Sequence, residues 1–136
     1  ASGCHDILMQ NLLVKDVAIC GLWLKTMRPR GGKNTDIQYK DIVIDGSGIP
    51  IRIASEYASM NTSAANVNPA MEVPDIGHIL FENIKDTGKN DHGMQFVGLK
   101  ESELHDFIFR GVSAKENGCL HQFVHCKNFC FDECEF

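Results

Sequence analysis

The chain has 136 residues, enough for one domain with a hydrophobic core and too few for two. Its net charge of −5 argues against nucleic-acid binding, because phosphate recognition normally requires a basic excess. No apolar run approaches the length of a membrane span, so we expect neither a nucleic acid nor a membrane as a partner.

A short pattern recurs along the chain: polar, apolar, any residue, aromatic or Met, polar, a turn-forming residue, apolar. The second, fourth and last positions are apolar, so in an extended strand they would fill one interior. Variable spacing between copies of a fixed pattern is typical of a solenoid whose turns carry insertions. The copies span residues 6–12, 36–42, 78–84, 106–112 and 128–134.

A second, shorter strand follows the copies after a glycine-containing turn. Apolar residues flank a middle residue that is usually polar, at 22–24, 51–53, 94–96 and around 120–123. Turns at which the chain changes direction are indicated at Asp45-Gly46, Thr87-Gly88 and Asn117-Gly118. Helical periodicity fits nowhere over more than about two turns.

These strands predict an all-β fold, a right-handed single-stranded parallel β-helix of about five turns. Strands of successive turns would lie about 4.8 Å apart. Residues 1–136 would form a single domain, and 55–74, a stretch rich in Ser, Asn and Ala without periodicity, would be a long inserted loop bordering a binding site. One interior column is predicted to contain Ile7, Ile37, Ile79, Phe107 and Phe129.

The sixth position of the pattern carries mostly short polar residues. They would either form a ladder of side chains or be chosen locally as turn residues. The sequence leaves both open for Asn11, Asp41, Asn83, Gly111 and Glu133.

Three stretches, in order and covering nearly the whole chain, resemble glycoside hydrolase family 28, the polygalacturonases and related pectin-degrading enzymes. Residues 21–26 (GLWLKT), with a Gly-rich turn and the strand at 35–42, are similar to the family's Gly-Ile-Arg-Ile-Lys-Thr region. Residues 49–57 are similar to its Pro-Ile-Xaa-Ile strand and following Tyr, and 79–87 to a later strand. The resemblance implies a pectin-lyase-like β-helix and inverting hydrolysis of O-glycosidic bonds in pectin or another uronate-containing polysaccharide. It also implies a secreted or periplasmic location, and we expect no cofactor and no metal.

The resemblance also implies substrate-binding residues. The family's Lys binds a uronate carboxylate, which implies that role for Lys25, and the family's groove Tyr matches Tyr57. The family's Arg position holds Trp23, which offers a stacking face without charge, while Arg52 occupies the equivalent outward position one turn later. Without the family, Lys25 would be read as a solvated lysine and Trp23 as either a sugar platform or packing.

Two further cations, Arg28 and Arg30, lie in a Pro-Gly turn, where they would either cradle an anion or belong to a solvated loop. The cysteines and histidines of the C-terminal region could be zinc ligands, but the cysteine spacing differs from that of structural zinc sites. A core stack of cysteines or one incidental disulfide is favoured for Cys126, Cys130 and Cys134, which lie near His121 and His125.

The family's catalytic Asp-Asp pair and His-Gly motif precede the Lys strand, and residues 1–20 contain neither. We therefore assign no catalytic residue and expect the chain to be the C-terminal part of a larger β-helix. The alternative is a non-catalytic β-helix module that binds carbohydrate or extends a larger protein. Either way, the uncovered first turn predicts self-association through the N-terminal end, near residues 7–17.

Overall fold

The computed structural model describes residues 3–28, 30–55, 72–114 and 119–136. None of these residues is helical, so none of them belongs to a helix that could cross a membrane. The strands are β1 (Cys4–Lys25), β2 (Lys33–Ala54), β3 (Asp75–Asp86), β4 (Gln95–Val97), β5 (Leu104–Ala114), β6 (Gln122–Val124) and β7 (Cys126–Asp132).

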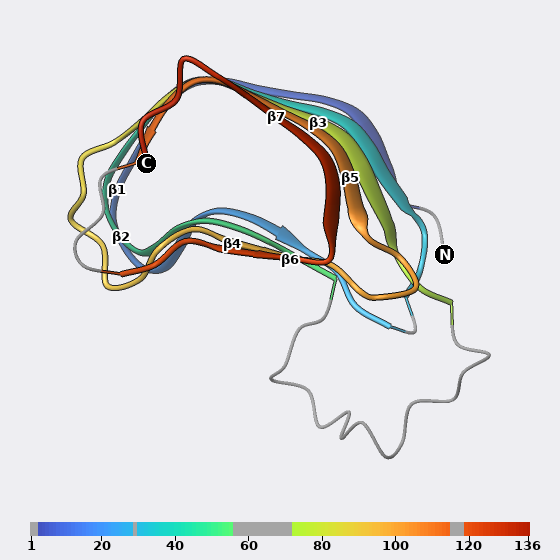
Figure 1. Ribbon diagram of the computed structural model, residues 1–136. Coiled ribbons are helices and arrows are strands. Elements are labelled where there is room, and N and C mark those ends of the chain that lie inside the picture. Colours follow the sequence, from blue (N-terminus) through green and yellow to red (C-terminus); the bar gives the residue numbers. More distant parts are fainter. Residues whose placement is uncertain (1–2, 29, 56–71, 115–118) are drawn as a thin grey trace.

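All strand pairs are parallel. The long strands β1 and β2 pair along their whole length, and β2 then pairs with β3 through its first half and with β4 at its end. β5 and β6 stack on β3 and β4, and β7 stacks on β5. The resulting sheet curls almost completely around one interior (Figure 1). This confirms the predicted all-β, parallel architecture and is consistent with a parallel β-helix.

The predicted interior column is confirmed by the strand register, which aligns Ile7 with Ile37, Ile79, Phe107 and Phe129 in successive layers. The three middle members are buried, and the two outer ones pack against the core. The rings of Phe107 and Phe129 are stacked with centroids 4.5 Å apart. Apolar side chains at one repeat position therefore meet directly across layers.

A second column comes from the aromatic position of the repeat. The ring of Phe81 stacks on Tyr39 at 4.9 Å and on Phe109 at 5.1 Å, and Phe109 stacks on Phe131 at 4.8 Å. These separations match the spacing of about 4.8 Å between neighbouring strands. Strand pairing alone thus brings the rings to stacking distance, and this column of the interior is a continuous stack of aromatic rings.

The sheet bends at two fixed points of each repeat. The residues at the first and sixth positions all have a positive φ between 50° and 60°. Asn, Asp and Gly tolerate this left-handed conformation best, which explains why they recur there. The first-position residues are Asp6, Asp36, His78, Asp106 and Asn128, and the sixth-position residues are Asn11, Asp41, Asn83, Gly111 and Glu133.

The sixth position is also part of a short ladder. Asp41 accepts hydrogen bonds from Gln10 Nε2 at 2.9 Å and from Asn83 Nδ2 at 2.7 Å, so its carboxylate links three layers. These bonds lower the pKa of the Asp41 carboxyl. Both interpretations of the sixth position therefore hold at Asp41: the residue forms the bend and bridges layers.

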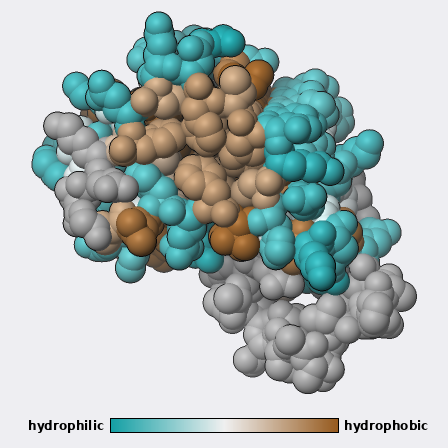
Figure 2. Space-filling model, in the orientation of Figure 1, coloured by the Kyte–Doolittle hydropathy of each residue, from teal (hydrophilic) through white to brown (hydrophobic). Residues whose placement is uncertain are grey.

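Both ends of the stack present apolar side chains. On β1, Met9 and Leu12 are 38% and 40% exposed, although their register partners on β2, Tyr39 and Ile42, are buried in the core. At the other end, a cavity of about 700 Å³ is lined mainly by aromatic residues that include Phe123, Phe131 and Phe136. Figure 2 shows an apolar patch in the middle of the face where β6 and β7 lie.

The six cysteines are all free. Cys126 and Cys134 pack against the core, and their thiols donate to the main-chain carbonyls of Val124 and Asp132. Burial raises the pKa of Cys126 to about 11. Cys130 is exposed. The favoured packing role therefore fits Cys126 and Cys134 and does not fit Cys130.

Candidate functional site

The last residues of β1 alternate between the core and the outer surface. Leu22 is buried, and Trp23 and Lys25 lie at the opposite positions of the strand. The Lys25 Nζ lies 4.9 Å from the centroid of the Trp23 ring, within the range of a cation–π contact. The strand alternation thus brings an indole and an ammonium group to one outer surface.

A second cation reaches the same ring from β2. Arg52 is the register partner of Trp23, and its Cζ lies 5.6 Å from the Trp23 centroid. Its neighbours Ile51 and Ile53 are buried in the core and so fix the direction of the Arg52 side chain. The structure therefore brings Lys25, Trp23 and Arg52 together, and we call these three residues the Trp23 cluster.

The Trp23 cluster continues along one column of the sheet. Arg52 aligns with Gln95 on β4, and Gln95 aligns with Gln122 on β6. The Arg52 Nε is buried and has no hydrogen-bond partner among the described residues. An aromatic face and two cations can contact a sugar ring and its acidic substituent, and the two amide side chains lie further along the same column.

The remaining predicted site residues lie elsewhere. Arg28 is mostly buried and forms an ion pair with Glu101 in the β4–β5 connection. Arg30 is exposed, and its backbone N–H donates to the Met27 carbonyl at 2.9 Å. Tyr57 and most of the 55–74 loop lie outside the described residues. The Arg28 charge is thus already matched by a carboxylate, which weakens the anion-cradle interpretation.

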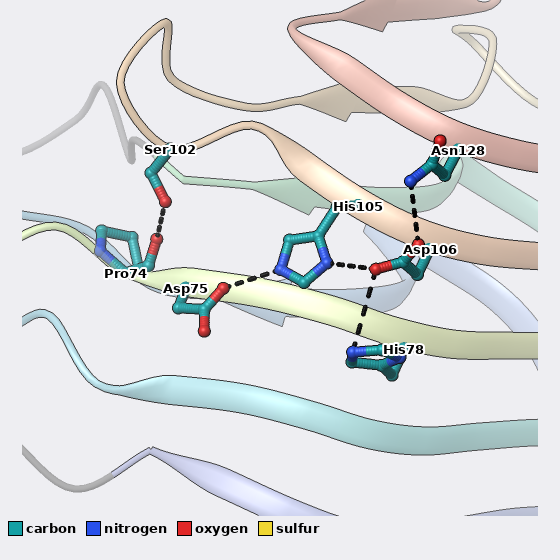
Figure 3. A network of polar contacts seen from close by, with 7 residues as sticks. All are labelled: Pro74, Asp75, His78, Ser102, His105, Asp106 and Asn128. Atoms are coloured by element: carbon teal, nitrogen blue, oxygen red, sulfur yellow. Dashed lines mark hydrogen bonds and ion pairs between the residues drawn. The ribbon is translucent and has the colours of Figure 1, made fainter.

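A second polar cluster, which the sequence analysis missed, lies between β3 and β5 (Figure 3). The His105 ring lies between two carboxylates: Nε2 is 2.8 Å from Asp75 Oδ1, and Nδ1 is 2.7 Å from Asp106 Oδ2. His78 Nε2 lies 3.8 Å from the same Asp106 oxygen. The available signal was the first repeat position, which carries a histidine in one layer and an aspartate in the next.

A glycine makes room for this arrangement. Gly77 is the register partner of His105, and a Cβ on Gly77 would come within 2.2–2.6 Å of the His105 ring. Burial opposes the positive charge of that ring, but the hydrogen bonds that Asp75 and Asp106 accept from it outweigh burial and raise the pKa of His105. The pKa of Asp106 is lowered, chiefly by its hydrogen bond with His105. Gly77 therefore allows a largely shielded, charge-matched histidine to lie across the layers.

Among the described residues, the grouping able to hold a metal ion is His78, His105 and Asp106, rather than the C-terminal cysteines. On the first strand, His5 Nδ1 and Asp6 Oδ2 form an exposed contact of 2.7 Å.

Comparison with known proteins adds one match. The model of the glycosyl hydrolases family 28 matches residues 3–134, nearly the whole chain. No curated protein and no solved structure matches the sequence. The match covers both the strand with Lys25 and the strand with Arg52. The chain belongs to glycosyl hydrolases family 28.

Proposed function

We propose that this chain is the substrate-binding part of a polygalacturonase-like hydrolase that acts on galacturonate-containing polysaccharide. The proposal includes a right-handed parallel β-helix of about five turns and a secreted or periplasmic location. The observation that carries it is the Trp23 cluster, in which two cations lie within 6 Å of one indole ring.

A uronate residue has the two features that this cluster can recognise. Its ring has an apolar face suited to an indole, and its carboxylate can accept hydrogen bonds from guanidinium and ammonium groups. The buried Arg52 Nε is a donor that such a carboxylate would satisfy. A neutral sugar would stack equally well but would leave the buried Arg52 Nε donor unsatisfied.

Hydrolysis also requires catalytic carboxylates, which the Trp23 cluster does not contain. Inverting glycosidases use a general acid and a general base roughly 6.5–9.5 Å apart, on opposite sides of the scissile bond. The family's Asp-Asp and His-Gly motifs precede the Lys strand, and residues 1–20 contain neither. We therefore propose that the catalytic carboxylates are supplied by residues outside this sequence.

The exposed apolar side chains of β1 support one partner besides the polysaccharide. Met9 is 38% and Leu12 40% exposed at inward-facing positions of a strand that pairs only with β2 among the described residues. Such an edge favours association with another strand or with a second copy of the chain. We propose self-association at residues 7–17, which concentration-dependent sedimentation would reveal and which a concentration-independent monomer would exclude.

We expect the chain to bind polygalacturonate without hydrolysing it. Binding that does not stabilise the transition state gives no rate, so the release of reducing ends should equal that of a protein-free control. Calorimetry with trigalacturonate and a reducing-end assay on polygalacturonate, run on one preparation, measure the two halves.

Either half can fail. Turnover above the control would show that a carboxylate of this chain is catalytic, and Asp6→Asn and Asp16→Asn would then identify it. Binding of neutral glycans in preference to polygalacturonate, again without turnover, would favour the non-catalytic carbohydrate-binding module.

A further inference from the structure

The cluster between β3 and β5 has the ligand set of a transition-metal site. We infer that His78, His105 and Asp106 bind a first-row divalent metal ion such as Zn²⁺. Their candidate ligand atoms lie within 4.8 Å of one another. Two imidazole nitrogens and one carboxylate oxygen form a ligand set that such ions favour over Mg²⁺ or Ca²⁺.

Contacts around the three residues orient their donor atoms. Asp75 Oδ1 lies 2.8 Å from His105 Nε2 and accepts its proton, so Nδ1 of the same ring faces Asp106. Asn128 Nδ2 donates to Asp106 Oδ1 at 3.1 Å, which leaves Oδ2 directed toward the two histidines. A carboxylate behind a ligating histidine is the usual outer contact of a zinc site.

The two distances from Asp106 Oδ2 to the histidine nitrogens require only a small adjustment. Ligand atoms around a tetrahedral zinc ion lie roughly 3.3 Å apart. Asp106 Oδ2 is 2.7 Å from His105 Nδ1 and 3.8 Å from His78 Nε2, so these two distances would change by about 0.6 Å and about 0.5 Å. The two histidine nitrogens would also move together to a separation of roughly 3.3 Å, from a starting distance within 4.8 Å. The metal would replace the proton between Nδ1 and Oδ2, and its binding would release that proton.

The backbone holds the three ligands in place. His78 and Asp106 occupy the same repeat position in adjacent layers, with φ of 53° and 58°. Gly77 leaves the space that the His105 ring occupies. The site therefore depends on the bends and register of the sheet rather than on a loop.

One side of the cluster is open. His78 and Asp106 border a cavity of about 420 Å³ that Asp36, Gln38 and Cys130 also line. A water molecule or an anionic oxygen can enter there as the fourth ligand. The cluster and the Trp23 cluster occupy different columns of the sheet, so the proposed metal is independent of the uronate proposal.

Calorimetric titration with Zn²⁺ tests the inference. We expect one Zn²⁺ site in the parent chain. In His78→Ala the Kd for Zn²⁺ should be at least roughly tenfold higher, because one of the three direct ligands is lost. His78 is exposed, so its truncation should leave the fold intact, and circular dichroism without metal checks this. His92→Ala is the matched control, because His92 is also exposed and lies outside the cluster.

A second readout separates histidine from cysteine ligation. With Co²⁺, the parent should show d–d absorption that His78→Ala loses, without a thiolate-to-metal charge-transfer band. Equal Zn²⁺ affinity in the parent and His78→Ala would overturn the inference, as would a thiolate band that persists in His78→Ala. Asp75→Asn, which keeps all three ligands, should bind Zn²⁺ more weakly than the parent but more tightly than His78→Ala.

Discussion

Replacing Phe81 with alanine is expected to lower the free energy of unfolding by about 3–5 kcal/mol. Phe81 is fully buried, and its ring contacts Tyr39, Phe96 and Phe109, which belong to three different layers. Truncation leaves a cavity that the stacked neighbours cannot fill, because strand pairing holds them in place. Urea unfolding followed by circular dichroism measures the loss as a lower midpoint at an unchanged slope.

The matched control for Phe81 is Ile108→Ala. Ile108 lies on β5 between the buried Phe107 and Phe109, but it is 41% exposed on the outer side of the sheet. Its truncation should cost only about 1 kcal/mol. Equal losses for the two variants would contradict the placement of Phe81 in the shared aromatic interior.

Removing both cations of the Trp23 cluster should nearly abolish binding of oligogalacturonate. In the double variant Lys25→Gln/Arg52→Gln we expect about 100-fold weaker binding, or about 2.7 kcal/mol. The loss arises because the substrate carboxylate exchanges charge-assisted hydrogen bonds for weaker neutral ones. Calorimetry with trigalacturonate at low ionic strength measures the effect.

Lys85→Gln provides the charge-matched control for the single variants Lys25→Gln and Arg52→Gln. Lys85 is exposed on β3, and it is far in register from Trp23. This substitution changes the net charge as each single cluster variant does but should leave the Kd for trigalacturonate within about twofold of the parent. If Lys85→Gln weakened binding as much as Arg52→Gln, the effect would be one of net charge rather than of the Trp23 cluster.

The repeat predicted the core well because the constraint behind it is local. Alternation of side chains across a strand decides which residues enter the interior, and stacking copies in register then fixes the column from Ile7 to Phe129. The positive φ at the first and sixth positions follows from the same repeat, since Asn, Asp and Gly recur there.

Contacts between layers were harder to predict. The His105 ring lies over Gly77, and its two carboxylate partners come from different layers, so the cluster appears only once the register is known. The pairing of Arg28 with Glu101 joins two connections that no periodicity relates. The closeness of Lys25, Trp23 and Arg52 was anticipated because alternation and register suffice to produce it.

Recognition of a uronate carboxylate by the Trp23 cluster is tested most directly by one comparison of affinities. Calorimetry should show that trigalacturonate binds at least roughly tenfold more tightly than its fully methyl-esterified form, which has the same sugar rings without charge. Added salt should reduce this difference by screening the charges. Equal affinity for the two ligands, or a preference for the ester, would contradict uronate recognition by Lys25 and Arg52.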